Sequence, residues 1–425
     1  MIRRLALFAY LVALATWGIM SYASFGQYIL EGSMFARLFE GRPYVSDFVN
    51  VYNAGLLSRR AMSEHINIYD PAVQDESVRK LIAPVVPEAP FNLQYPPYFF
   101  ALMLPLSFFS LTGAWLVWNG VFLTGLVTTL RALVIRLQGR MEQAFCYVMV
   151  FASYPTWVTV ELGQTSLPEF LFVIGFFHTL RKKQFFFCGL IMAFITIKLQ
   201  YTPFFGIIGL MVGGLPFLGG LFAALSGLCL LSWMILGGQN LLNYPLALLH
   251  GETSKSVSGV SAMEMQNLRG NLALLMHADN TLVHLTALVV MSIAVVLLAV
   301  LWRRYALDAA NQTDSRFELL ASCSVLIALT TSLHTHSQDY IMAALPCIWL
   351  WQSQKTDRTD DWIRKLIAMF PIYSWMYLFL KFIVPLIMIQ PLFAWAVVMC
   401  VLTLPKVLQR KEPLPDSAFT DSAST

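Results

Sequence analysis

The sequence predicts an all-α polytopic membrane protein. Of its 425 residues, 57% are hydrophobic and only 12% are charged, and the mean hydropathy is +0.64. A soluble domain is closer to half apolar and about a quarter charged, so the bilayer is expected to be the main solvent of this chain. Because backbone polar groups in hydrocarbon must be paired within the chain, the apolar runs are predicted to be helices.

Charge and cysteine content exclude several other classes of protein. The formal net charge of +4 is scattered, and no basic stripe suggests binding to nucleic acid. The cysteines all fall inside apolar runs and form no CxxC pair, which indicates core residues rather than disulfides or a metal framework. The six are Cys146, Cys188, Cys229, Cys323, Cys347 and Cys400.

The N-terminal segment is predicted to be a first membrane span over 5–23. Its basic start and apolar core also fit a cleaved signal peptide, but it has no clear A-x-A site, so an uncleaved helix is expected. Arg3 and Arg4 place the N-terminus in the cytoplasm. Residues 24–97 then form a long extracytoplasmic loop.

The next apolar stretch, 98–112, is short for a span and contains Pro105. A full crossing there would put the basic RLQGR segment (136–140) outside the cytoplasm. The stretch is therefore predicted to be re-entrant or interfacial, with 113–135 crossing inward.

The remaining spans bring the predicted number of transmembrane helices to about twelve. They are expected at 144–160, 166–180, 185–202, 203–214, 219–237, 282–302, 318–333, 339–352, 363–385 and 389–404. With this threading five basic clusters, the C-terminus included, lie in the cytoplasm, as the positive-inside rule requires. The short segment 203–214 is interpreted as a half-helix, and 238–281 as a second extracytoplasmic loop. Residues 1–404 are predicted to be one membrane domain, and 405–425 a disordered cytoplasmic tail.

Polar side chains gather on the predicted outer face. They come from the first loop, including the stretch YVSDFVNVY, and from the turns ELGQTS, KLQYTP, EMQNLRGN and SLHTHSQDY. Ionisable groups at membrane depth are costly and usually functional. The candidate site residues are Asp47, Tyr52, Tyr95, Gln164, Lys198, Asn267, Arg269, His334, His336 and Asp339.

This set suits sugar transfer from a lipid-linked donor. Nucleotide sugars are absent outside the cytoplasm, so a donor there arrives on a lipid, commonly polyprenyl phosphate. The enzyme needs a carboxylate to deprotonate an acceptor hydroxyl, for which Asp47 is the candidate. It needs a cation for the departing phosphate, either Lys198 or Arg269, and an apolar groove for the isoprenoid tail.

Each candidate also has a structural interpretation. Asp47 can simply cap the following helix, Lys198 can extend to the lipid headgroups, and Arg269 can bind headgroups or pair with Glu264. Gln164 can satisfy a turn, and the YPP stretch that contains Tyr95 is expected to shape the loop and start a helix.

The pair His334 and His336 forms an HxH pattern that is also found at metal sites. Residues two apart do not face each other on a helix, and no third ligand beyond Asp339 is evident. We therefore expect no metal, with one histidine at the site or both in interfacial packing. The tryptophans Trp157, Trp302, Trp349, Trp351 and Trp362 are predicted to form an interfacial belt rather than to bind a cofactor.

The ordered motifs resemble glycosyltransferase family 87. They are, in chain order, Asp47-Phe48 with Tyr52, Tyr95-Pro96-Pro97 with Pro105, Gly163-Gln164-Thr165, Lys198 with Pro203, Asn267-Leu268-Arg269-Gly270, and Ser332-Leu333-His334 with Asp339. The phrase NIYDP (67–71) is also similar to the family. The resemblance covers about residues 45 to 346. One departure is the four residues LQYT between the lysine and its proline.

The resemblance implies a GT-C fold and a polyprenyl-phosphate-mannose-dependent α-mannosyltransferase or a relative with another sugar. It implies Asp47 as the catalytic base of an inverting transfer to a glycolipid or lipid-linked glycan, with no cofactor beyond the lipid-linked substrate. It implies the cytoplasmic membrane of a bacterium as the location, with an extracytoplasmic active site.

Three rival functions remain on the sequence. A transporter or flippase of lipid-linked sugars should place charges near the bilayer midplane and often shows two related halves, and neither feature is found. An O-antigen ligase or polymerase works on the same face but relies on arginines in large late loops, whereas here the largest loop is the first. A non-catalytic membrane scaffold leaves the clustered ionisable residues unexplained.

Overall fold

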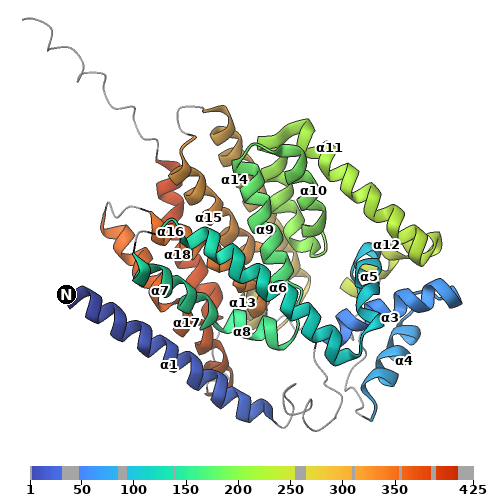
Figure 1. The fold of residues 1–425 in the computed structure, drawn as a ribbon. Coiled ribbons are helices and arrows are strands. Elements are labelled where there is room, and N and C mark those ends of the chain that lie inside the picture. The colour runs from blue at the N-terminus through green and yellow to red at the C-terminus, as the bar shows by residue number, and fades with distance from the viewer. Residues whose placement is uncertain are drawn as a thin grey trace, which may run out of the picture.

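A computed structural model shows an assembly of helices (Figure 1), with no strand among the residues that it describes. These residues are 2–30, 47–84, 93–137, 139–253, 265–308, 312–353, 357–383 and 389–409. Parts of the predicted first loop (31–46 and 85–92), Glu264 and most of the predicted tail (410–425) lie outside them. The last helix runs to Leu408, four residues beyond the predicted end of the membrane domain.

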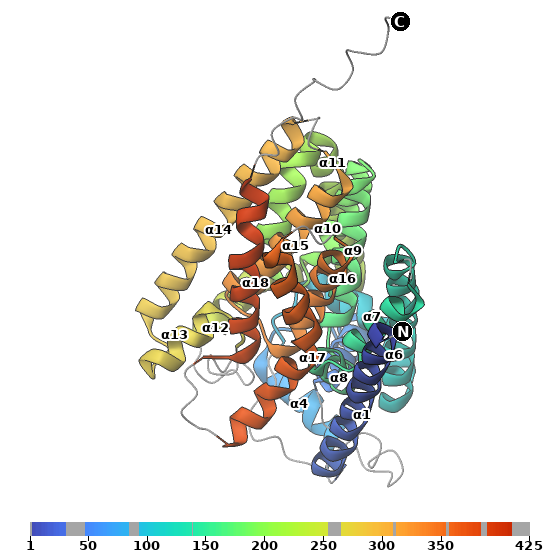
Figure 2. The ribbon, with the colours of Figure 1, turned by 90° about the vertical axis from the view of Figure 1, so that its left-hand side faces the viewer.

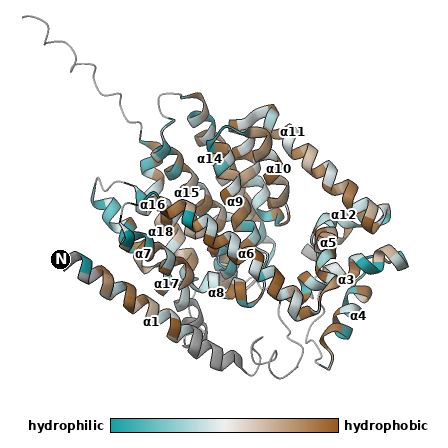
Figure 3. Cartoon of the chain, viewed as in Figure 1, coloured by the Kyte–Doolittle hydropathy of each residue, from teal (hydrophilic) through white to brown (hydrophobic). Residues whose placement is uncertain are grey.

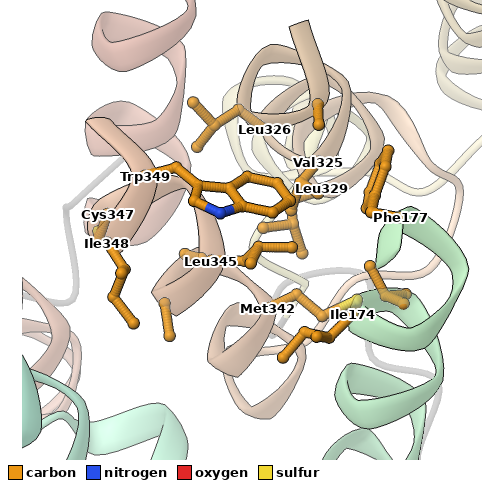
Figure 4. Packing of buried hydrophobic residues seen from close by; sticks show 14 of the residues in the cluster. Ile174, Phe177, Val325, Leu326, Leu329, Met342, Leu345, Cys347, Ile348 and Trp349 are labelled. Carbon is orange, nitrogen blue, oxygen red and sulfur yellow. The ribbon is translucent and has the colours of Figure 1, made fainter. Parts of the chain in front are cut away.

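The centre of the bundle is a hydrophobic core between α9 (Ser166–Arg181), α15 (Asp314–Thr331) and α16 (Ala344–Gln352). Figure 4 shows the Trp349 side chain of α16 beside Leu326 of α15 and facing Phe177 of α9. The Phe177 and Trp349 rings are 5.9 Å apart. In a bilayer such side chains hold helices together by close van der Waals packing rather than by leaving water, so this core sets how α9 and α15 are placed.

Other helices surround this core (Figures 1 and 2). Contacts join α10 to α11, α14 to α15, α17 to α18 and α1 to α7. Their bounds are α1 Ile2–Leu30, α6 Leu111–Val134, α7 Arg140–Phe151, α8 Tyr154–Glu161, α10 Phe185–Ile195, α11 Thr202–Leu236, α14 Thr281–Leu307, α17 Arg358–Ile383 and α18 Pro391–Leu408.

Within the described residues, four helical segments are long and apolar enough to cross a membrane. They are Leu111–Val134, Leu199–Leu236, Thr281–Leu307 and Pro391–Leu408. Figure 3 shows α10 and α11 mainly in the hydrophobic colour, whereas α3 (Phe48–Glu64) and α4 (Pro71–Ile82) carry hydrophilic patches. The described part of the chain is thus helical, with the apolar helices of a membrane protein, and the figure of about twelve spans stays a prediction.

The two spans predicted at 203–214 and 219–237 are one element, α11, with a sharp kink at Gly214. A Cβ at Gly209 would lie 2.3 Å from the Phe217 ring. On a straight helix these residues are about 12 Å apart along the axis. The second half of α11 therefore folds back on the first, which agrees with the half-helix predicted from Pro203.

The predicted re-entrant or interfacial stretch 98–112 forms two short helices. These are α5 (Pro97–Met103) and η1 (Leu104–Phe108), with Pro105 in the first turn of η1. Both pack against α3, where a Cβ on Gly55 would lie 2.4 Å from the Met103 carbonyl oxygen. The close approach requires glycine at this position and fixes α3 on the short helices.

The prediction that five tryptophans form an interfacial belt is only partly correct. Trp302 is fully buried, its indole N–H donates to Ser324 Oγ at 2.9 Å, and Trp157 and Trp349 are also buried. A partner inside the protein removes the need for the N–H to reach the interface. Trp351 is half-buried and Trp362 is exposed. The six cysteines are free. Four of them are buried in the core as predicted, Cys400 is half-buried, and Cys229 is exposed, so the prediction of a core position is wrong for Cys229.

The two ends of the core helices differ in character. Arg181, at the end of α9, pairs with Asp314 and Glu318 at the start of α15, and Arg136 joins Glu318 at 3.0 Å. The two helices therefore run antiparallel. The 16 residues of α9 span about 24 Å. The opposite ends of both helices hold the predicted site.

Candidate active site

Asp47 stands at the N-cap position of α3 but does not cap it. Its side chain makes no capping hydrogen bond, and the residue is exposed. Gln164 Nε2 donates to its Oδ2 instead. The structural interpretation of Asp47 as a plain cap is therefore wrong, and the carboxylate faces the turn between α8 and α9.

The turn that presents Gln164 depends on Gly163. α8 ends in a Schellman-type arrangement, in which Gly163 has φ +61° and the Gln164 N–H donates to the Thr159 carbonyl at 2.9 Å. A Cβ on Gly163 would lie 2.8 Å from the Cβ of Phe48. The turn thus rests directly on the residue after Asp47, which brings the Gln164 amide to the carboxylate.

Tyr95 packs next to the turn that presents Gln164. Its ring stacks on Phe99 with centroids 4.1 Å apart, and its hydroxyl is 3.5 Å from Thr165 Oγ1. Pro96 and Pro97 begin α5, the helix-starting role predicted for the YPP stretch. Tyr95 is half-buried, and its hydroxyl approaches the residue that follows Gln164. It therefore borders the turn that faces the Asp47 carboxylate.

Lys198 and Asp339 form a buried ion pair next to this turn. Lys198 Nζ donates to Asp339 Oδ1 and to Ser166 Oγ at 2.7 Å, and Ser166 Oγ donates to the same Oδ1 at 2.6 Å. The His336 N–H donates to Asp339 Oδ2 at 3.0 Å. We call Ser166, Lys198 and Asp339 the buried triad. It joins the start of α9, the end of α10 and the turn after α15.

The four residues between Lys198 and Pro203 have a clear local role. Leu199–Tyr201 form one 3-10 turn, and Pro203 then lies in the first turn of α11. Within this turn Gln200 Nε2 donates to the His334 carbonyl at 2.8 Å. The departure from the family pattern thus leaves Lys198 directed at Asp339.

Arg269 lies in a second polar cluster. It begins α13 (Leu268–Met276), is buried, and its Nη2 donates to Asp279 Oδ2 at 2.9 Å. Its Nη1 is 3.3 Å from His334 Nε2, and its Nη2 is 3.2 Å from His284 Nε2. Asp279 is thus the carboxylate partner of Arg269 within the described residues, and the predicted pairing with Glu264 lies outside them. We call Arg269, Asp279, His284 and His334 the arginine cluster.

The turn after α15 connects the two groups of residues. His334 contacts Arg269, while Asp339, five residues later, accepts from Lys198. Ser166, which belongs to the buried triad, is two residues after Gln164. The structure therefore links Asp47, Gln164, Tyr95, Lys198, Asp339, His336, His334 and Arg269 through adjacent contacts at one end of the bundle.

Two of the predicted site residues, Tyr52 and Asn267, hold helices in place. Tyr52 is buried, and its hydroxyl donates to the Phe109 carbonyl at 2.7 Å, so it ties α3 to η1. Asn267 caps α13: its Oδ1 accepts from the Gly270 N–H at 2.9 Å and its Nδ2 donates to the Ser332 carbonyl at 2.9 Å. Both side chains make their hydrogen bonds within the protein.

Three residues at the site were not in the predicted set. Ser166 belongs to the ELGQTS turn, and its polar neighbours in the sequence were a usable signal. Asp279 and His284 follow Arg269 at no helical spacing, because the chain turns between α13 and α14, so no periodic pattern marks them. Across the described stretches no group of three or more His, Cys, Asp or Glu is placed to hold a metal ion.

The comparison with family models gives one match. The model of glycosyltransferase family 87 matches residues 93–332, more than half of the chain. The chain belongs to glycosyltransferase family 87. This family 87 protein is accordingly a glycosyltransferase with an all-helical membrane architecture. A search of curated proteins found no match.

The family match covers part of the site. It includes Tyr95, Gln164, Lys198 and Arg269 and ends at Ser332, so Asp47 and Asp339 lie outside it. The case for Asp47 in this family 87 chain therefore rests on its geometry beside Gln164. The case for Asp339 rests on its contacts with Lys198 and Ser166.

Proposed function

We propose that this family 87 glycosyltransferase transfers a hexose, with mannose as the first sugar to test, from polyprenyl phosphate to a hydroxyl of a glycolipid or lipid-linked glycan. The reaction takes place on the extracytoplasmic face of a bacterial cytoplasmic membrane, with both termini in the cytoplasm. The observation that carries the proposal is the exposed Asp47 carboxylate, released from capping and held by Gln164.

In the proposed step Asp47 accepts the proton of the acceptor hydroxyl while that oxygen forms a bond to the anomeric carbon. The bond between this carbon and the phosphate oxygen breaks, and polyprenyl phosphate leaves with the electron pair. Attack from the face opposite the leaving group inverts the anomeric centre. The Gln164 amide fixes the orientation of the carboxylate, which a general base requires.

We place the arginine cluster next to the leaving phosphate. The partners of Arg269 reach solvent, with side-chain exposures of 31% for Asp279 and 40% for His284. The Lys198 partner Asp339 is only 1% exposed. A phosphate can thus approach the arginine cluster, whereas Lys198 acts through the buried triad. Stabilising charge that develops on a leaving group is typically a large part of catalysis.

The isoprenoid tail is proposed to lie along α13 and α14, next to Arg269. Leu275 and Met276 at the end of α13 and Leu282 and Leu285 at the start of α14 are exposed. Apolar side chains beside an arginine fit a lipid whose charged head is a phosphate. α14 is also one of the described helices that are long and apolar enough to cross a bilayer.

The test uses purified protein in nanodiscs with radiolabelled polyprenyl-phosphate-mannose and a panel of membrane glycolipids. Transfer of label with inversion at the anomeric carbon supports the proposal. A nucleotide sugar serves as the control donor and should give no product. Transfer from the nucleotide sugar alone, or a product with retained configuration, contradicts the proposed reaction.

A further inference from the structure

Glu169 is a buried carboxyl group that the proposed reaction does not use. It lies on α9 one turn after Ser166, and its residue is 1% exposed. Its Oε1 is buried without a hydrogen-bond partner among the described residues. Ser166, one turn before it on α9, contacts both Lys198 and Asp339, so the buried ion pair lies beside Glu169.

The two carboxyl groups beside Lys198 are treated differently by their surroundings. Asp339 accepts from the Lys198 ammonium, the Ser166 hydroxyl and the His336 N–H. Within the residues that the structure describes, Glu169 has no ion pair with Lys198. Hydrogen bonds to the charged form of a carboxyl group favour that form. The donors therefore select Asp339 as the carboxylate.

Charge balance points the same way. One ammonium and one carboxylate leave the buried triad neutral, and a second carboxylate would leave an uncompensated negative charge away from water. Burying an unpaired charge is so unfavourable that a group normally neutralises instead. A proton on Glu169 removes this charge at little cost, because no donor at Glu169 has to be given up.

We propose that Glu169 is a neutral carboxylic acid and a positioning residue, which keeps the Lys198 ammonium committed to Asp339. An ionised Glu169 would compete for Lys198 and pull it from Ser166, two residues after Gln164. It would also weaken the hold on Asp339 and thereby on the turn that places His334 against Arg269. The neutral acid thus preserves the alignment of Asp47 with the arginine cluster.

The first test compares Glu169→Gln with Glu318→Gln. Gln reproduces the shape of a neutral acid, so Glu169→Gln should keep the thermal midpoint of the wild type and its turnover within about twofold. Glu318 is also shielded, at 14% exposure, but is ion-paired with Arg136 and Arg181, so its Gln variant should be clearly less stable. A Glu169→Gln protein that fails to fold, or that loses turnover tenfold or more, overturns the proposal.

The second test is a double-mutant cycle with Asp339→Asn. When Asp339 is made neutral, Glu169 can release its proton and compensate Lys198, so the single variant should still fold. Asp339→Asn combined with Glu169→Gln leaves the buried lysine without a counter-charge. The ratio of folded to unfolded protein in the double variant should be about tenfold lower than the two single effects together predict. Additive effects contradict the proposal.

The third test reads the proton directly. The infrared carboxylic-acid C=O band of protein labelled with ¹³C-glutamate should be present in the wild type, absent in Glu169→Gln and lost in Asp339→Asn. A wild type without the band overturns the proposal. This inference rests on the proposed function only for the turnover readout. If no transfer is found with any donor, the infrared and folding results still decide it.

Discussion

Replacing Gly163 with alanine tests how the turn at 162–165 holds Gln164 beside Asp47. Two independent features oppose the substitution. Gly163 has φ +61°, where an L side chain is strained, and the new Cβ would lie 2.8 Å from both Cβ and Cδ2 of Phe48. The left-handed conformation costs about 1–2 kcal/mol. Overpacking of a filled contact costs a further ~1–3 kcal/mol.

These terms sum to about 2–5 kcal/mol if the turn keeps its conformation. The turn is more free to move than the core of α9, so part of the strain should be relieved by a shift of Gln164 away from Asp47. We therefore expect Gly163→Ala to lose turnover at least tenfold, with a smaller loss in thermal stability. One tenfold step in rate corresponds to about 1.4 kcal/mol.

The assay measures initial transfer rates per folded protein, together with thermal midpoints in the same detergent. Gly214→Ala is the control, because Gly214 also has a positive φ (+54°) but its Cβ would meet nothing within 4 Å. It should lower stability and leave the rate per folded molecule unchanged. Equal turnover and stability in Gly163→Ala and the wild type would refute the role of the turn.

The other predictions concern single contacts. Gln164→Ala removes a hydrogen bond to a charged group, which is worth about 1.5–3 kcal/mol. We therefore expect kcat/KM to fall about 10–100-fold while the melting temperature stays near that of the wild type. An unchanged kcat/KM would show that Gln164 does not support Asp47. Tyr52→Phe should destabilise the fold by about 1 kcal/mol in thermal unfolding without a change in rate per folded molecule; a selective loss of rate would return Tyr52 to the site. Asp279→Asn should weaken donor binding, measured as KM for the lipid donor, because Arg269 loses its carboxylate partner; an unchanged KM would place the phosphate elsewhere.

The general location of the site could be predicted from the sequence. The polar residues of the first loop, the GQT turn, the Lys198 turn and the turn after α15 do converge at one end of the bundle, linked by the contacts of Gln164, Ser166 and His334. The reason is that long apolar helices leave their polar residues at turns, and threading assigns those turns to one side.

The sequence could not show which of these residues belong to the site and which ones stabilise the fold. Tyr52 and Asn267 are as polar as the other candidates, but each donates to a backbone carbonyl far away in the sequence, that of Phe109 or Ser332. Asp279 reaches Arg269 only because the chain turns between α13 and α14. Pairings of this kind depend on the tertiary arrangement, which periodicity does not encode.

The points at which helices bend or reverse inside the apolar runs also could not be predicted from the sequence. The reversal at Gly214 follows from a positive φ and from Phe217 packing against the preceding half of α11. Hydropathy does not change at this position, so it does not show that the chain reverses here. The burial of Trp302 has a similar origin, because its partner Ser324 lies on a neighbouring helix.

The most direct test of the central claim is the transfer rate of Asp47→Asn beside the wild type, with donor binding measured on both. Asparagine keeps the size of the side chain but cannot accept the acceptor proton as a base. We predict that transfer vanishes while the variant binds polyprenyl-phosphate-mannose as the wild type does. Transfer at the wild-type rate in Asp47→Asn would contradict the assignment of Asp47 as the base.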